Sequence, residues 1–211
     1  AIADLGSVLE LRPDYGVGIV TALMRVEGAS YGVLANSSAH LGGAIDAEAA
    51  DKAADFLELC ESHRMRGESV RHTGFMVGPE SEKDATVRRF GRFFVAGARL
   101  TVPFGMIILR KGYGLGAMAM AGGSFHAPEF TVAWPTGEIG GMGLEGAVRL
   151  GFRKELDAAE TPREREELFG RLVALAYQQG KALQAATSFE LDDVIDPADS
   201  RAWIERLVQP R

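Results

Sequence analysis

The chain has 211 residues, of which 46% are apolar and 25% are charged, a balance typical of a folded globular protein. Its net charge of -6 argues against nucleic acid as the main partner, because a phosphate-binding face needs a basic surface. No apolar run approaches the roughly 20 residues of a membrane-spanning helix, so we expect no membrane partner. The single cysteine, Cys60, excludes an internal disulfide and favours a reducing, cytoplasmic compartment. The N-terminus shows no basic-then-apolar leader, and whether the chain is a fragment or a free-standing subunit stays open.

Apolar periods typical of strands and of helices alternate along the chain. The run "TVPFGMIILR" is almost continuously apolar, as in a strand that is buried on both faces. The segment "IDAEAADKAADFLELC" instead places alanines, Leu57 and Cys60 on one helical face, with Asp46 as N-cap. This alternation predicts an α/β fold with a largely parallel sheet. The predicted elements are strands near 18–26, 31–36, 103–110 and 129–134, with helices near 46–61 and 80–99.

Two more helices are predicted near the C-terminus from their start signals. Thr161 and Glu164 form a capping box, and Pro162 occupies the first helical position. We expect this helix to continue without a break through "QQGKALQAA". Asp196 and Pro197 repeat the same scheme ahead of "ADSRAWIERLV".

The segment "KGYGLGAMAMAGGSF", residues 111–125, concentrates glycines between a buried strand and a short apolar helix. The first N–H groups of a helix lack internal partners and carry partial positive charge, so such a turn can bind an oxyanion through the main chain. Glycine also lets a ligand approach the backbone closely. The alternative is that these glycines serve only tight turns and close helix–strand packing. Similar loops at 72–80 and 134–148 favour a backbone-lined pocket, which suits a thioester or an amide-like group better than a metal.

Five longer motifs occur in order along the chain: "LGGAIDAEAADKAADFLELC", "GFMVGPE", "RKGYGLGAMAMAGGSF", "AWPTGEIGGMGLEGAV" and "DDVIDPADSR". Together they resemble the carboxyltransferase component of biotin-dependent acyl-CoA carboxylases. A protomer of that family has two crotonase-like domains, and the chain resembles only the C-terminal one, over residues 1–211. The resemblance implies a crotonase-like (ClpP/crotonase) ββα spiral. It also implies carboxyl transfer from carboxybiotin on a carrier protein to an acyl-CoA, giving malonyl- or methylmalonyl-CoA, with biotin as cofactor, a coenzyme A thioester as substrate and no metal.

The resemblance also implies which residues form the site. Gly116 and Ala117 align with the family's Gly-Ala oxyanion pair, with one residue inserted before it, and would hold the biotin ureido oxygen. The freed biotin nitrogen takes the α-proton, so no protein base is required. Replacing Gly116 by valine is expected to block biotin with little loss of folding. The residues expected to bind biotin or substrate are Gly74, Phe75, Tyr113, Gly114, Met118, Ala119, Gly140 and Gly141.

The implied partners are the family's N-terminal carboxyltransferase domain, a biotin carboxyl carrier protein and biotin carboxylase, within a homo-oligomer. Two alternatives stay open. One is a biotin-dependent acyl-CoA decarboxylase subunit, because the oxyanion chemistry runs in either direction. The other is a non-catalytic crotonase-like assembly subunit. The acyl substrate is not determined, since Met118 and Ala119 stand where the family often has Tyr and Asp.

The segment "ESHRMRGESVRHTGF" departs from the family, which has a buried apolar strand there. A parallel strand covered on both faces should not carry Arg66, Glu68 and Arg71 unpaired. We therefore hypothesise a short frame slip across residues 64–72. Resequencing that finds intact in-frame codons would remove this hypothesis.

Other reactive residue types have simpler interpretations. Cys60 is expected in the core rather than as a nucleophile. The histidines show no ligand spacing, so no metal site is expected. Glu138 and Glu145 are expected to cap or pair rather than to catalyse. Arg110 and Lys111 end a strand, in solvent or near coenzyme A phosphates or a carrier domain. The outer face of the second predicted helix should carry Arg88, Arg89 and Arg92.

Overall fold

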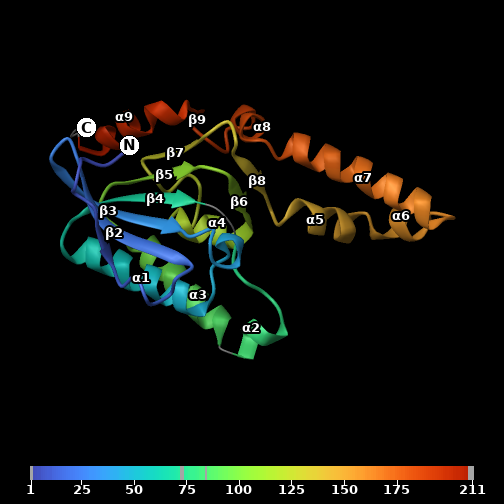
Figure 1. The fold of residues 1–211 in the computed structure, drawn as a ribbon, viewed down its shortest axis with the longest axis horizontal. Coiled ribbons are helices and arrows are strands. Elements are labelled where there is room, and N and C mark those ends of the chain that lie inside the picture. Colours follow the sequence, from blue (N-terminus) through green and yellow to red (C-terminus); the bar gives the residue numbers. More distant parts are fainter. Residues whose placement is uncertain (1, 72–73, 84, 209–211) are drawn as a thin grey trace.

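The computed structural model describes residues 2–71, 74–83 and 85–208, and the side chains of residues 67–71 are not among what it describes. A seven-stranded sheet in the order β1-β2-β3-β4-β5-β7-β9 forms the centre of the molecule. Helices α1 and α3 lie along one face of this sheet, and α9 lies along the other (Figure 1). The predicted α/β fold with a largely parallel sheet is confirmed.

The sheet changes from antiparallel to parallel pairing at β3. Strands β1, β2 and β3 pair antiparallel, whereas each later neighbour pairs parallel with the one before it. The four strands predicted from periodicity are confirmed as β2, β3, β5 and β7. A separate two-stranded parallel sheet joins β6 to β8. The strands are β1 (Leu9–Leu11), β2 (Ile19–Val26), β3 (Ala29–Asn36), β4 (Arg66–Arg71), β5 (Phe104–Ile108), β6 (Lys111–Tyr113), β7 (Phe130–Ala133), β8 (Glu138–Gly140) and β9 (Asp193–Val194).

The helices follow the start signals of the sequence but not all of its expected lengths. Asp46 caps α1 by accepting a hydrogen bond from the Ala49 N–H at 2.9 Å, and the Thr161–Glu164 capping box is present. The helices are α1 (Ala47–Ser62), α2 (Pro79–Lys83), α3 (Thr86–Ala98), α4 (Gly114–Met120), α5 (Leu144–Gly151), α6 (Arg153–Asp157), α7 (Pro162–Gln179), α8 (Ala182–Thr187) and α9 (Ser200–Glu205), with short 3₁₀ turns at Leu41–Gly43, Pro197–Asp199 and Arg206–Val208.

Two predicted helices are each divided in the structure. The helix expected near 80–99 is split into α2 and α3, because Ala85 adopts a left-handed conformation with φ 53°. The helix that begins at Pro162 ends at Gln179, so the expectation of a continuous helix is wrong. Lys181 pairs instead with Glu138 of β8, and the Gly180 carbonyl accepts a hydrogen bond from the Ile139 N–H at 2.7 Å. Tertiary pairing with a strand therefore interrupts the helix.

Small residues on α1 allow it to pack closely against α3 and the sheet. Ala50, Ala53 and Ala54 are fully buried there together with Phe93. Cys60 lies in the same core, and burial raises the pKa of its thiol to about 12. The expectation that Cys60 is a core residue is confirmed.

Two of the basic residues on α3, Arg89 and Arg92, form ion pairs with α1. The guanidinium of Arg92 donates to Asp55 at 2.6 Å and to Glu58 at 3.1 Å, both on α1. The Arg89 Nε lies 3.5 Å from Oδ2 of Asp51, which is also on α1. Ion pairs between α1 and α3 therefore accompany their apolar contact. Arg88 and Arg92 are exposed, as expected for the outer face of a helix, and Arg89 is half-buried.

Strand β4 occupies the position that the charged sequence argued against. It lies between β3 and β5, with Val33 opposite Glu68 and Glu68 opposite Gly105. The backbone of residues 66–71 is thus paired on both edges, although its sequence conflicts with a buried strand. His72 lies outside the described residues, and the frame slip stays a hypothesis.

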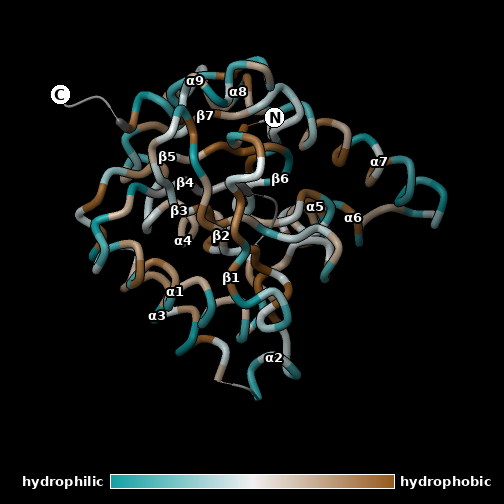
Figure 2. Tube along the Cα trace, turned by 60° about the vertical axis from the view of Figure 1, so that its left-hand side comes forward, coloured by the Kyte–Doolittle hydropathy of each residue, from teal (hydrophilic) through white to brown (hydrophobic). Residues whose placement is uncertain are grey.

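Helices α5, α6 and α7 form an arm that extends away from the sheet (Figure 1). Helix α7 carries both hydrophobic and hydrophilic stretches along this arm (Figure 2). None of the residues of α7 is buried. In the part of the chain that the structure describes, no helix has the length and apolar character needed to cross a membrane.

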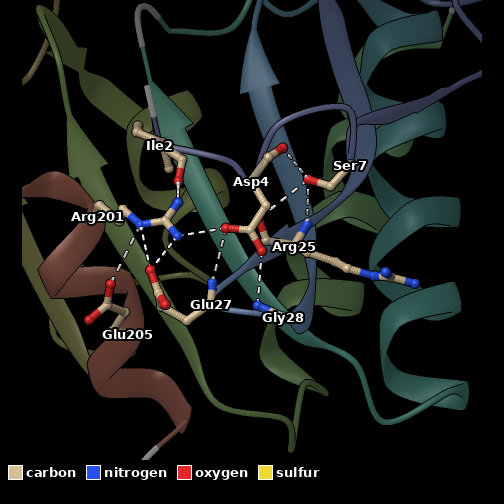
Figure 3. Close-up of polar contacts among 8 residues, drawn as sticks. All are labelled: Ile2, Asp4, Ser7, Arg25, Glu27, Gly28, Arg201 and Glu205. Carbon is tan, nitrogen blue, oxygen red and sulfur yellow. Dashed lines mark hydrogen bonds and ion pairs between the residues drawn. The ribbon is translucent and has the colours of Figure 1, made fainter.

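A cluster of charges joins the N-terminal segment to α9 (Figure 3). The Arg201 guanidinium donates to Asp4 at 2.6 Å, to Glu27 at 2.5 Å and to the Ile2 carbonyl at 2.5 Å. Asp4 also accepts from the Gly28 N–H at 2.9 Å. Hydrogen bonds from Arg201 and Gly28 hold the pKa of Asp4 below its usual 3.8. Arg201 therefore connects three segments: the N-terminus, the β2–β3 turn and α9.

Replacing Asp4 by Asn should lower the free energy of unfolding at pH 7. Because the folded-state pKa of Asp4 is depressed, its stabilisation is present above the unfolded value near 3.8 and is lost as pH falls through the lower folded value. Urea unfolding from pH 7 to pH 3 should show the gap to wild type closing with acid. The exposed Asp14, replaced by Asn, is the control and should show no such gap. A gap that widens with acid would contradict this role.

The segment from Arg64 to Arg71 should be the least stable part of the sheet, because its charges oppose burial. Amide hydrogen exchange should be fast there and slow across Ile107–Leu109 of the chain, where β5 ends. Equal protection in the two segments would contradict the prediction.

Candidate functional site

The candidate site is formed where β6 leads into α4. Tyr113 is the last residue of β6 and the N-cap of α4, which begins at Gly114. Gly114 adopts φ +56°, and a Cβ atom there would lie 2.7 Å from the Gly141 carbonyl oxygen. Both the turn and the close approach of the loop after β8 therefore require glycine at this position.

Gly116 allows a still closer contact between two backbones. A Cβ atom on Gly116 would lie 2.6 Å from the carbonyl carbon of Gly74 and 2.6 Å from the nitrogen of Phe75. At Gly112, by contrast, the nearest atoms would be 3.5 Å away, an ordinary contact. Close packing, the simpler interpretation of these glycines, thus applies at Gly116. The expectation that Gly116→Val folds normally is wrong, because a valine side chain would overlap main-chain atoms.

The first turn of α4 presents N–H groups without an acceptor earlier in the same helix. In a helix that begins at Gly114, these include the N–H groups of Leu115 and Gly116. Ala117 is the fourth helical residue, and its side chain is fully buried. Since these backbone donors lie at the positive end of the helix, the turn is suited to a negatively charged oxygen.

A cleft of about 530 Å³ opens on one side of α4. It brings together four of the predicted binding residues, Gly114, Met118, Gly140 and Gly141. Met118 is 36% exposed toward this side, which gives the cleft a flexible apolar wall.

The other predicted residues lie outside the lining of this cleft. Phe75 stacks on Phe90 with ring centroids 3.9 Å apart and packs against the α1–α3 core. Ala119 is fully buried in the same core. Gly74 lies against Gly116, and Tyr113 is only 7% exposed. Helix α4 therefore divides the predicted residues between the cleft on one side and a packed backbone contact on the other.

The sequence did not single out the remaining residues of the cleft. Some follow α4 directly, and others come from the ends of α7 and α8, far away in the chain. Only the "GGSF" segment after α4 carried a signal, because it adjoins the glycine motif. These residues are Ser124, Phe125, His126, Ile139, Gln179, Gln184, Ala185, Ser188 and Glu190.

Both candidate glutamates pair with tyrosines, as expected. The Tyr113 hydroxyl donates to Glu138 at 2.8 Å, and the Tyr177 hydroxyl donates to Glu145 at 2.5 Å. The Tyr177 hydrogen bond holds the pKa of Glu145 below its usual value, and the same bond raises the pKa of Tyr177 to about 12. Within the described residues, no group of three or more His, Cys, Asp or Glu side chains is placed to hold a metal ion.

Comparison with known proteins identifies the family. The sequence profile of the family described as carboxyl transferase domain matches residues 1–208. The methylmalonyl-CoA carboxyltransferase 12S subunit of Propionibacterium freudenreichii subsp. shermanii is 37% identical over 208 residues, which are 96% of the chain and 38% of that protein. A solved single-chain, multi-domain long-chain acyl-CoA carboxylase is 74% identical, with a TM-score of 0.89, over 98% of the chain and 20% of its own length. The transcarboxylase 12S crystal structure, described as a hexamer assembly, is 33% identical with a TM-score of 0.88, over 100% of the chain and 41% of its own.

These comparisons define the fold as crotonase-like, which confirms the expected fold class. The chain belongs to the carboxyl transferase domain family, and the resemblance found in the sequence is confirmed. It spans 38% of the length of the 12S relative.

Replacing Gly116 by Ala should lower the free energy of unfolding by about 1–3 kcal/mol, because the backbone of residues 74–75 must move to admit a Cβ atom. Chemical denaturation of the purified chain measures this difference. Gly112→Ala is the matched control and should change stability by no more than about 0.5 kcal/mol. Equal stability of the two variants would show that the contact at Gly116 is not tight.

Proposed function

We propose that the chain is the C-terminal domain of a biotin-dependent acyl-CoA carboxyltransferase, with the backbone N–H of Gly116 directed at the biotin ureido oxygen. Of the Gly116–Ala117 pair that the resemblance implies, Gly116 lacks an acceptor within the helix, whereas the Ala117 N–H has the Tyr113 carbonyl as its helical acceptor. The observation that carries this proposal is the start of α4, where a glycine turn presents main-chain donors beside a cleft of about 530 Å³. Membership of the carboxyl transferase domain family supports it.

The residues present fit such a group. Gly114 lines the cleft, and the donors lie at the positive end of a helix. When bound, carboxybiotin supplies both the carboxyl group and the nitrogen that accepts the substrate's α-proton. The protein then has to hold and stabilise an oxygen that gains negative charge, which backbone N–H groups do without reorganising. Loss of one such donor typically costs about a hundred- to a thousandfold in rate.

We infer a long-chain acyl-CoA as the substrate, rather than acetyl- or propionyl-CoA. The solved long-chain acyl-CoA carboxylase is 74% identical to the chain, well above the 37% of the methylmalonyl-CoA relative. The cleft supports the same choice, because Met118, Phe125 and Ile139 give it an apolar wall. Methionine adapts to an extended alkyl chain more readily than the Tyr that the family often carries there.

The arm and the segment after α8 support the proposed partners. Several large apolar side chains are exposed there, with Phe189 reaching 85%. Exposed apolar groups in such number favour burial against another protein surface. We assign this surface to the N-terminal carboxyltransferase half, within a cytoplasmic homo-oligomer that also receives the biotin carrier and biotin carboxylase. The exposed residues are Met142, Leu150, Phe152, Leu175, Leu183 and Phe189.

Carboxyl transfer should require the assembled enzyme. The purified chain alone should not carboxylate acetyl-, propionyl- or long-chain acyl-CoA, whereas adding the N-terminal half and a carboxybiotinylated carrier should give turnover, highest on the long chain. Fixation of labelled bicarbonate measures the rate. Robust turnover by the chain alone, or none by the assembled enzyme, would refute the proposal.

Filling the cleft should impair the assembled enzyme without unfolding it. Met118→Trp places a bulky aromatic ring in the cleft and should lower kcat/KM by about a hundredfold. The ring would displace the substrate from its reactive geometry. Val87→Trp on the exposed side of α3 is the matched control and should react at the wild-type rate. Equal rates for the two variants would place the substrate elsewhere.

A further inference from the structure

We infer that Tyr113 and Glu138 act as a positioning pair, which fixes the first turn of α4 relative to the β8 wall of the cleft. The inference rests on the proposed function of that turn. It concerns the hydroxyl–carboxylate contact directly at the start of α4, in which Tyr113 is buried and Glu138 is half-buried. Its contribution is to hold the backbone donors in place, without touching the substrate.

The pair joins two short strands through side chains as well as through backbone. Tyr113 ends β6 and Glu138 begins β8, and the parallel register sets Lys111 opposite Glu138 and Tyr113 opposite Gly140. The Tyr113 hydroxyl donates to Glu138 Oε2 at 2.8 Å, so the side-chain contact is offset by two residues from the backbone register. The Glu138 N–H donates to the Arg110 carbonyl at 2.5 Å, which fixes the acceptor's own backbone.

Tyr113 also contacts the main chain on both sides of α4. Its carbonyl oxygen lies 3.0 Å from the position of a Cβ atom on Gly74, and its ring lies 3.7 Å from the corresponding position on Gly140. The next residue, Gly114, approaches the Gly141 carbonyl. The backbone of Tyr113 thus lies against the Gly74 segment, and its ring lies against the cleft wall at Gly140.

The hydroxyl is suited to a fixed structural contact rather than to proton transfer. Burial and the Glu138 hydrogen bond raise the pKa of Tyr113 above its usual 10, so the group keeps its proton. Leaving the half-buried Glu138 carboxylate without its hydrogen-bond donor is unfavourable. The two side chains are therefore held in contact. Since the proton is already donated to Glu138, the hydroxyl is not free to donate to a biotin oxygen.

Four variants of the assembled enzyme separate positioning from direct binding. Tyr113→Phe and Glu138→Leu should each lower kcat by about ten- to a hundredfold, with little change in the KM for acyl-CoA. Glu138→Gln should restore most of the rate, because its amide oxygen accepts the same hydrogen bond. The double variant Tyr113→Phe/Glu138→Leu should be no slower than either single variant, as expected for residues that act as a unit.

Thr101→Val is the matched control. It removes another hydroxyl that donates to a carboxylate, that of Glu61 on α1, and should leave kcat unchanged. A normal rate for Tyr113→Phe would overturn the inference. A slow Tyr113→Phe together with a normal Glu138→Leu would also overturn it, because Tyr113 would then act on the substrate directly.

Amide hydrogen exchange in the isolated chain tests the pair without any assay of turnover. Tyr113→Phe and Glu138→Leu should speed exchange across residues 114–120, whereas Glu138→Gln and Thr101→Val should not. Unchanged exchange in Tyr113→Phe would overturn the inference. If the assembled wild-type enzyme transfers no carboxyl group, the proposed function fails, and this exchange result still decides whether the pair holds α4.

Discussion

The structure depends on one close contact between two stretches of main chain. The backbone of Gly74 and Phe75 reaches the first turn of α4 at a distance that leaves no space for a side chain on Gly116. The same segment is held from its other side, because the Ile45 N–H donates to the Gly74 carbonyl and the Met76 N–H donates to the Ile45 carbonyl. The loops after β3 and β4 and the start of α4 are thus fixed to one another through backbone alone.

A second glycine contact fixes the other end of the short helix. A Cβ atom on Gly97 of α3 would lie 2.9 Å from the Cα of Gly122, which follows α4. Between these two contacts, Ala117 and Ala119 are fully buried. A helix of seven residues has little stability of its own, so its position is set by the surfaces around it. This accounts for a segment with many glycines and small residues: α4 is placed by close approach, and Gly114 of its first turn lines the cleft.

Polar contacts around this core have different strengths and roles. The Tyr113–Glu138 bond is partly buried and directional, and it lies at the start of α4. The ion pairs of Arg92 with α1 and of Arg201 with Asp4 are partly exposed, so solvent screens them and they mainly set which segments lie together. The arm has few buried side chains and exposes large apolar ones, the surface that we assign to the N-terminal half.

Helix caps and buried strands could be predicted from the sequence. The Asp46 N-cap, the Thr161–Glu164 capping box and the buried run of β5 depend on neighbours within a few residues, so spacing and residue type suffice to predict them. The burial of Cys60 follows from the periodicity of one helix face. The family was readable because its motifs are long and occur in order.

Only the tertiary structure decided the features that depend on distant parts of the chain. Helix α7 ends before Gly180 because the Gly180 carbonyl accepts a hydrogen bond from the Ile139 N–H and Lys181 pairs with Glu138. No local signal specifies that pairing. Strand β4 lies in the centre of the sheet because β3 and β5 pair with it on both edges, although its charges oppose burial. Gly116 packs against residues about 40 positions earlier in the chain. Gln184 and Glu190 line the same cleft as Gly114, although they lie about 70 positions later. Such contacts depend on how whole elements pack, which local propensity does not encode.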